Sequence, residues 1–468
     1  MAKRYDLIIV GLGSGGMSAA EFASGLGLRV AAVERDRVGG DCLWTGCVPS
    51  KALLASAKAA HTMRHGSDYG LPVVDPEMDT ELVWKRLKSI QADIAATDDS
   101  PERFESLGVD LVRGTARLTG PREVVVDGVR RLKTRYILVC TGSRPATPPI
   151  EGIEQADILT SENVFELDRA PASLVMIGGG PISVELAQAF TRLSTPTTVL
   201  QRGPRLLPRD EPAVVDRLSE LLTGEGVDVW LDSDAERIER VGEQRVVHGI
   251  SAGQPRSWKA EAVLVAAGRK PNVEGLGLAE LGVEVGHKGI EVDERLRTAV
   301  PSVYAAGDVA GRNLFTHSAG YEAVRAVRDM FFPGRGTADA LVPWCTFTDP
   351  ELAHAGLTST EAREAHGDDV EVVELDLAHS DRARAEGASG VLVLVSAKDR
   401  LVGAHLLAPA AGETIHELLL AMKQGLALSD LASLVHIYPT LATGVGQLAA
   451  HAAYAKAARW SWLTKLWR

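Results

Sequence analysis

Residues 5–16 read YDLIIVGLGSGG, an apolar run that ends in a cluster of glycines. The apolar run predicts a buried strand, and the alanine-rich residues 17–26 that follow predict a helix. A second apolar segment, residues 28–33, ends at Glu34. Strand, glycine turn, helix, strand and acid in this order predict a dinucleotide-binding βαβ unit.

Each glycine of the turn has a physical role in such a unit. Gly11 makes the tight turn, Gly13 lets the backbone approach a pyrophosphate, and Gly16 allows the helix to pack closely on the strand. The pyrophosphate would lie at the helix N-terminus, and Glu34 is placed for the hydroxyls of the adenosine ribose.

The same pattern recurs from residue 173, where SLVMI is followed by GGGPIS and a second predicted helix. The positions matching the three glycines are Gly178, Gly180 and Ser183. Its second strand ends at Gln201-Arg202 instead of an acid. Because an arginine there suits the 2′-phosphate of NADP, Arg202 with Arg205 favours NADPH, although NADH stays possible if these arginines are simply solvated.

Residues 39–51 read GGDCLWTGCVPSK, which places two cysteines between the nucleotide units. The spacing lets Cys42 and Cys47 form a disulfide. Cys47 should begin a helix, where free N–H groups favour a thiolate, and Lys51 follows one turn later on the same face. The alternatives are a structural disulfide, a zinc site and two unrelated core cysteines. With four cysteines in the whole chain and no further Cys/His cluster, we favour a cycling disulfide and expect no metal site.

Composition narrows the class of protein. A length of 468 residues predicts two or three domains, and a net charge of −12 argues against a nucleic-acid partner. We expect no membrane span, no targeting segment and a cytoplasmic protein. At the basic, tryptophan-rich C-terminus, Trp460, Leu463 and Trp467 fall at helical spacing. We favour docking of this stripe on protein over attachment to an anionic membrane surface.

With these features the chain resembles the class I pyridine nucleotide–disulfide oxidoreductases, which include dihydrolipoamide dehydrogenase, glutathione reductase and mercuric reductase. The resemblance also rests on TGSRP at 141–145, AGRKPN at 267–272 and YAAGD at 304–308. It implies further FAD-binding positions at Gly40, Lys51, Thr141, Gly142, Gly268, Arg269, Gly307 and Asp308. It also implies that Cys47 is the sulfur nearer the flavin, that Cys42 is the interchange sulfur, and that Glu185 pairs with Lys51.

The same resemblance implies an α/β fold with two Rossmann-like domains, one for FAD and one for NAD(P), and a C-terminal α+β dimerisation domain. The expected order is FAD domain with the redox disulfide (1–150), NAD(P)H domain (151–270), FAD-binding or central segment (271–340) and dimerisation domain (341–468). The expected assembly is a homodimer. Cys140 and Cys345 lie in apolar runs and should be inert core thiols.

One segment departs from the family pattern. Tyr438 and Thr443 occupy the places of the acid–base histidine and its glutamate, and His436 lies two residues out of register. Tyrosine, with a pKa of about 10, is a poor base at neutral pH, although it can offer a hydroxyl near a soft metal. Mercuric reductase also has tyrosine here, yet its C-terminal cysteine pair is missing, since the last cysteine is Cys345.

These features predict an enzyme that passes electrons from NADPH through FAD to Cys42–Cys47 and on to an external oxidant. That oxidant would be a metal ion such as Hg(II), or a small disulfide. Two alternatives remain: a flavin-centred quinone reductase in which the cysteines are secondary, and a redox-sensing flavoprotein with little turnover.

Overall fold

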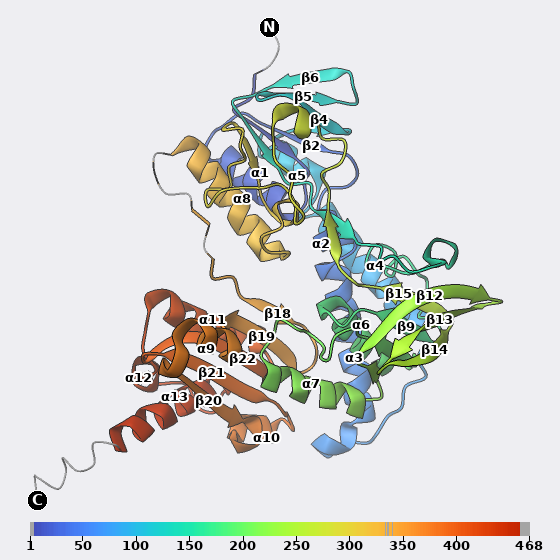
Figure 1. The fold of residues 1–468 in the computed structure, drawn as a ribbon, viewed down its shortest axis with the longest axis vertical. Helices are drawn as coiled ribbons and strands as arrows, with labels where there is room; N and C mark the ends of the chain where they lie inside the picture. Colours follow the sequence, from blue (N-terminus) through green and yellow to red (C-terminus); the bar gives the residue numbers. More distant parts are fainter. Residues whose placement is uncertain (1–3, 333, 335–336, 339, 459–468) are drawn as a thin grey trace, which may run out of the picture.

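The computed structural model describes residues 4–332, 334, 337–338 and 340–458 (Figure 1). Its first unit is a parallel sheet of order β17-β7-β1-β2-β3. The strands are β1 (Leu7–Val10), β2 (Val30–Glu34), β3 (Asp110–Arg113), β7 (Tyr136–Val139) and β17 (Val303–Ala305). The outer strand β17 therefore joins this sheet from more than 160 residues after β7.

Alternate side chains of β1 are buried on opposite faces of this sheet. Leu7 and Ile9 pack under α1 (Ser14–Gly25) and α8 (Thr316–Phe331). Ile8 and Val10 pack against the antiparallel sheet of β4 (Ala116–Gly120), β5 (Glu123–Val126) and β6 (Arg130–Lys133). Burial on both faces explains why this strand is continuously apolar.

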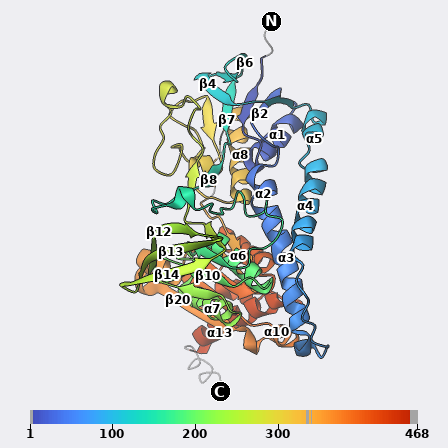
Figure 2. The same cartoon turned by 90° about the vertical axis from the view of Figure 1, so that its right-hand side faces the viewer.

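The redox segment leaves this sheet as α2 (Gly40–Trp44) and continues as the long helix α3 (Cys47–Arg64). Figure 2 shows α3 beside α4 (Thr80–Ala96), and α3 also packs on α6 (Pro181–Arg192) of the second unit. A short helix, α5 (Pro101–Ser106), leads into β3. Helix α3 thus carries the cysteine segment from the first unit to the second.

The second unit has a parallel sheet of order β11-β10-β9-β15. These strands are β9 (Leu174–Ile177), β10 (Thr197–Leu200), β11 (Asp228–Trp230) and β15 (Ala262–Val265). An antiparallel sheet follows, formed by β12 (Ser233–Val241), β13 (Gln244–Ser251) and β14 (Gln254–Ala260). An antiparallel ribbon of β8 (Ser143–Pro145) and β16 (Arg269–Pro271) pairs the two segments that run between the units.

The C-terminal unit is an antiparallel sheet of order β18-β19-β22-β21-β20. Its strands are β18 (Trp344–Thr346), β19 (Glu351–Gly356), β20 (Val370–Asp376), β21 (Val391–Ala397) and β22 (Arg400–Ala408). One face packs on α11 (Ala411–Gln424) and α13 (Leu441–Ala458), and the other on α7 (Pro212–Gly224) of the second unit. The shorter helices are α9 (Ser359–His366), α10 (Asp381–Ala385) and α12 (Leu428–Ala432).

This architecture confirms the predicted α/β fold, with two Rossmann-like units and a C-terminal α+β unit. Among the described helices, none combines the length and apolarity needed to cross a bilayer. The predicted tryptophan stripe at Trp460, Leu463 and Trp467 lies outside the described residues.

Candidate active site

The two cysteines of the redox segment lie side by side as free thiols. Cys42 is in the single turn of α2, and Cys47 is the first residue of α3. The turn before them needs glycines, because Gly39 and Gly40 have φ of 99° and 55°. The Cys42 thiol donates a hydrogen bond to the Cys47 sulfur, and Thr316 Oγ1 lies 3.2 Å from that sulfur.

These contacts shift the pKa values of the two thiols in opposite directions. The hydrogen bond from Cys42 is the largest cause that lowers the pKa of Cys47, which reaches about 6, and Thr316 and Lys51 lower it further. The same hydrogen bond and burial raise the pKa of Cys42 well above its usual range. At neutral pH the pair therefore holds a thiolate at Cys47 and a protonated thiol at Cys42.

Lys51 and Glu185 come from neighbouring helices and meet beside this pair. Lys51 Nζ lies 2.9 Å from Glu185 Oε2, and the Glu185 side chain is 7% exposed. The backbone N–H of Phe347 donates to the other Glu185 oxygen at 2.8 Å, and Lys51 Nζ lies 4.2 Å from the centre of the Phe347 ring. Three parts of the fold, α3, α6 and the segment after β18, thus fix the position of the Lys51 ammonium.

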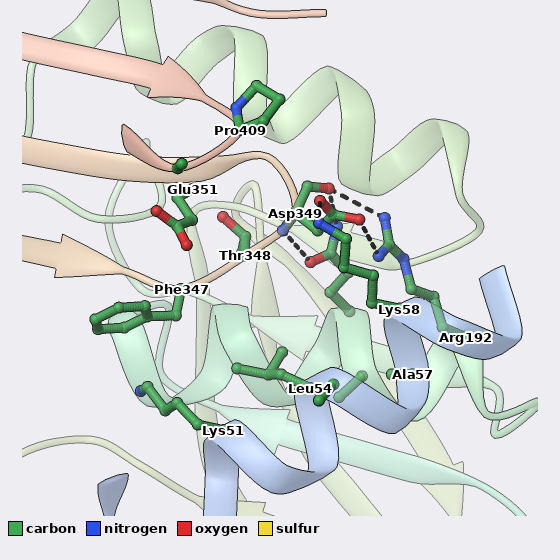
Figure 3. Close-up of a pocket in the computed structure, with 14 residues that line it drawn as sticks. Lys51, Leu54, Ala57, Lys58, Arg192, Phe347, Thr348, Asp349, Glu351 and Pro409 are labelled. Atoms are coloured by element: carbon green, nitrogen blue, oxygen red, sulfur yellow. Dashed lines mark hydrogen bonds and ion pairs between the residues drawn. The ribbon is translucent and has the colours of Figure 1, made fainter. Parts of the chain in front are cut away.

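Lys51 also borders a cavity of about 180 Å³ between α3, α6 and the segment from Phe347 to Glu351 (Figure 3). On its far side, Arg192 donates to Asp349 Oδ2 at 2.8 Å, and Lys58 Nζ lies 2.9 Å from Asp349 Oδ1. The cations lining that side of the cavity are therefore paired with carboxylates, and the buried Arg192 also bonds Glu225 at 2.7 Å.

The first glycine turn forms a cradle where side chains would not fit. A Cβ at Gly11 would lie 2.4 Å from the Cys140 carbonyl oxygen, and one at Gly16 would lie 1.9 Å from the Gly11 carbonyl oxygen. A Cβ at Gly40 would lie 2.7 Å from the Cα of Gly13, so the redox segment passes directly over the turn. Helix α1 begins here without a side-chain cap, which leaves its N–H groups for an anion.

Glu34 stands at the end of β2, as the motif predicts, and its Oε2 accepts a hydrogen bond from the Leu12 N–H at 2.6 Å. In the second unit Gln201 takes the equivalent position, and its Oε1 accepts from the Gly179 N–H at 3.0 Å. The two strands thus end in the same contact, made by a carboxylate in one unit and by a neutral amide in the other. An amide there removes the negative charge that would oppose a 2′-phosphate.

The second turn differs from the first in its third position. Gly178 has φ of 110° and its Cβ would lie 2.6 Å from the Ala266 carbonyl oxygen, whereas a Cβ at Gly180 would meet nothing within 4 Å. Ser183 is fully buried and has no hydrogen-bond partner among the described residues. Beyond the turn Arg202 is exposed, and Arg205 Nε lies 2.9 Å from Asp216 Oδ1.

Two further glycine-containing segments, residues 141–146 and 267–272, are joined by hydrogen bonds. Thr141 Oγ1 donates to the Asn272 carbonyl oxygen at 2.7 Å, and the Asn272 N–H donates to the Gly142 carbonyl oxygen at 3.0 Å. The Gly268 carbonyl oxygen accepts from Ala146 at 3.0 Å. These contacts hold the β8–β16 ribbon against the first nucleotide cradle.

Asp308 ends another glycine-containing segment, YAAGD at 304–308. It follows Gly307, whose φ is 77°. Asp308 Oδ2 accepts a hydrogen bond from Ser143 Oγ at 2.6 Å and lies 3.5 Å from Arg269 Nε. Burial raises the pKa of Asp308. Arg269 also pairs with Asp41, directly before Cys42, so a single guanidinium links the Asp308 carboxylate to the redox turn.

Tyr438 belongs to the segment between α12 and α13, which lies away from α2 of the same chain (Figure 1). Its side chain is 65% exposed, and its hydroxyl donates to Asp381 Oδ2 at 2.6 Å. That hydrogen bond raises the pKa of Tyr438. Thr443 Oγ1 donates to the Ile437 carbonyl oxygen at 2.9 Å.

His436 is held within the fold instead of facing solvent, and its side chain is 8% exposed. Its Nε2 lies 2.9 Å from Glu417 Oε1, and its Nδ1 lies 3.3 Å from the Leu434 carbonyl oxygen. Both ring nitrogens are therefore directed at protein oxygen atoms instead of at a substrate.

A family model described as pyridine nucleotide-disulphide oxidoreductase matches residues 5–327. The dimerisation domain model of the same family matches residues 342–449. The chain belongs to this family of pyridine nucleotide-disulphide oxidoreductases.

Several relatives align with nearly the whole chain. Dihydrolipoyl dehydrogenase of Thermus scotoductus is 35% identical over 460 residues, which are 96% of this chain and 97% of that protein. Mercuric reductase of Bacillus cereus is 34% identical over 450 residues, which are 94% of this chain and 70% of that protein. The Cu(II) complex of the HOCl-induced flavoprotein disulfide reductase RclA from Escherichia coli has a TM-score of 0.85 and 26% identity, covering 96% and 99% of the two chains.

As a pyridine nucleotide-disulphide oxidoreductase, the chain is a flavoprotein-type enzyme for which FAD and a nicotinamide dinucleotide are the typical cofactors. The residues present fit FAD. The turn at Gly11 and Gly16 and the segment at Gly40 that passes over it have no room for side chains, the N-terminus of α1 is uncapped, and the half-buried Asp308 carboxylate lies nearby. These residues would hold the pyrophosphate and the polyol chain of the cofactor.

Sequence reasoning missed Thr316 and Asp381, although both contact predicted site residues. Neither belongs to a motif, and each lies far along the chain from its partner. Cys140 is buried, and burial raises its pKa; Cys345 is half-buried, and burial raises its pKa as well.

Proposed function

We propose that this enzyme uses NADPH to reduce the Cys42–Cys47 pair, which in turn reduces an external oxidant, a metal ion such as Hg(II) or a small disulfide. The observation that carries the proposal is geometric: two adjacent free thiols, with Cys47 at the start of α3, within 3.2 Å of Thr316 Oγ1 and near the Lys51 ammonium that Glu185 holds. These contacts lower the pKa of Cys47 and raise that of Cys42. When bound, FAD supplies the two-electron relay between the nicotinamide and the cysteine pair.

The chain's own residues set the state of the two sulfurs. Thr316 and Lys51 stabilise negative charge on Cys47, and Glu185 keeps the Lys51 ammonium in place. Cys42 keeps its proton until an oxidant takes the electrons of the pair. The neighbouring relatives support this class of oxidant, since they include mercuric reductases and a flavoprotein disulfide reductase in complex with Cu(II).

NADPH is the proposed donor because Gln201 replaces the acid at the end of the second strand and Arg202 follows it, exposed. A homodimer is the proposed assembly because the family's dimerisation domain covers residues 342–449. In that dimer we place Tyr438 of the partner subunit next to Cys42. The proposed domain boundaries are those expected from the sequence: 1–150, 151–270, 271–340 and 341–468.

The test is NADPH oxidation by the purified holoenzyme with a mercuric salt, a small disulfide or a quinone as oxidant. Cys42→Ser and Cys47→Ser are assayed beside the wild type, with Cys345→Ser as a control in which the cysteine pair stays intact. The proposal predicts an oxidant whose turnover is lost in both active-site variants and retained in the control. Quinone turnover that is equal in all four proteins, with no cysteine-dependent oxidant, would instead identify a flavin-centred quinone reductase.

A further inference from the structure

The segment that replaces the acid–base dyad has an unusual proton arrangement. The Tyr438 hydroxyl donates to Asp381 Oδ2 at 2.6 Å, so its proton points at a carboxylate and its oxygen is left as an acceptor. Asp381 is the first residue of α10, and its neighbour Ser380 caps that helix through a hydrogen bond to the Ala383 N–H. The carboxylate therefore sits on a fixed helix end instead of a free loop.

The other polar groups of the described residues 434–443 offer no proton donor in its place. Both ring nitrogens of His436 face acceptors inside the fold. The Thr440 and Thr443 hydroxyls donate to the Ile437 carbonyl oxygen at 2.7 and 2.9 Å. Tyr438 is the outward-facing polar side chain of this segment, flanked by the exposed Val435 and Ile437.

The two classes of oxidant make opposite demands on protons. Reduction of a two-electron metal ion M²⁺ by the pair breaks the Cys42 S–H bond, forms the Cys42–Cys47 S–S bond, and yields M⁰ and one free H⁺. Reduction of a disulfide RSSR forms the same Cys42–Cys47 bond but breaks the RS–SR bond and releases two thiolates. One of them takes the Cys42 proton, and the other needs a proton from a further donor to become RSH. The first reaction needs only a proton acceptor, whereas the second needs a donor.

We propose that Asp381 is a specificity-determining residue, which holds the hydroxyl proton of Tyr438 and so selects a metal ion over a disulfide as oxidant. This inference rests on the proposed function, in which Tyr438 of the partner subunit adjoins Cys42. The Tyr438 oxygen can accept a hydrogen bond from the Cys42 thiol, whose proton then passes to solvent, or it can ligate a metal ion. It cannot give a proton to a leaving thiolate, because Asp381 holds that proton.

The experiment compares mercuric salt with hydroxyethyl disulfide as oxidant for the NADPH-reduced holoenzyme. Asp381→Ala frees the tyrosine proton and should raise disulfide turnover about tenfold while lowering metal turnover severalfold. In Tyr438→Phe/Asp381→Ala the gain should vanish, since no hydroxyl remains. Asp381→Asn keeps an acceptor of the same shape without the charge and should give a smaller gain. Glu364→Gln, which removes an exposed carboxylate on α9, is the matched control and should change neither turnover.

A readout independent of turnover is the ultraviolet titration of Tyr438, taken as the difference between each protein and its Tyr438→Phe counterpart. The pKa of Tyr438 should fall in Asp381→Ala, because the hydrogen bond that raises it is lost. If that pKa falls and the ratio of disulfide to metal turnover stays at the wild-type value, the inference is wrong. If metal turnover survives in Cys42→Ser, the proposed function itself fails, whatever Asp381 does.

Discussion

Replacing Cys42 by alanine should make Cys47 a weaker acid, because the hydrogen bond from Cys42 is the largest cause of its lowered pKa. A hydrogen bond to a charged group contributes about 1.5–3 kcal/mol, and one pKa unit corresponds to about 1.4 kcal/mol, so the pKa should rise by roughly 1–2 units. With a pKa of about 6, nearly all of Cys47 is thiolate at pH 7. After the substitution only about a quarter would be, for a rise of ~1.5 units.

The assay is the rate of Cys47 alkylation by iodoacetamide in the reduced holoenzyme, followed by mass spectrometry between pH 4.5 and 10. The rate should increase with pH in both proteins, because the thiolate is the nucleophile, and its midpoint should lie near pH 6 in the wild type. At pH 7 the variant should react about fourfold more slowly once each curve is scaled to its high-pH plateau.

Scaling to the plateau separates acidity from access, since removal of a thiol also opens space around Cys47. Thr316→Val serves as a second perturbation. It should raise the midpoint less than Cys42→Ala does, because the hydrogen bond from Thr316 lowers the pKa of Cys47 less than the hydrogen bond from Cys42 does. The reasoning is refuted if the wild-type midpoint lies near pH 9, or if Cys42→Ala leaves the midpoint in place.

Three further predictions concern other parts of the molecule. Arg192→Ala removes a buried guanidinium that bonds the half-buried Glu225 and Asp349 carboxylates, and it leaves Asp349 with Lys58 alone. It should lower the free energy of unfolding in urea by about 1.5–3 kcal/mol, whereas Arg205→Ala, at an exposed ion pair, should cost at most about 1 kcal/mol. An equal loss in both variants would contradict this ranking. Arg202→Ala should raise KM for NADPH severalfold and leave KM for NADH unchanged in steady-state kinetics, and a parallel rise in both would remove the argument for the 2′-phosphate. Replacing Tyr438 by His together with Thr443 by Glu should raise disulfide reductase activity, and no gain would count against the missing base as the limiting factor.

The sequence predicted the parts of the site that lie close together along the chain. The turn at Gly11–Gly16, the acid at Glu34 and the Cys42–Cys47 pair are each set by short spacing, so periodicity and glycine positions were enough to find them. The Lys51–Glu185 pair joins residues 134 apart and was reached through family resemblance alone.

The contacts that no motif encodes could not be predicted. Thr316 reaches Cys47 from 269 residues away because α8 packs across α1, and nothing in the local sequence marks it. Asp381 reaches Tyr438 from 57 residues away, on a five-residue helix that local propensity does not specify. The sequence shows that Gln201 stands where the first unit has an acid. It does not show that the Gln201 side chain accepts a hydrogen bond from the second glycine turn, because that contact depends on how the strand end folds back on the turn.

The pairing of β17 with β7 has a consequence for how the chain is made. The first sheet closes only when Val303–Ala305 has been synthesised, whereas every strand of the second parallel sheet lies between Leu174 and Val265. During synthesis the ribosome therefore releases a complete second unit while the first still has the edge of β7 unpaired. The later unit in the sequence is thus able to fold first, and the earlier one, which contains the cysteine pair, waits for a strand that follows it.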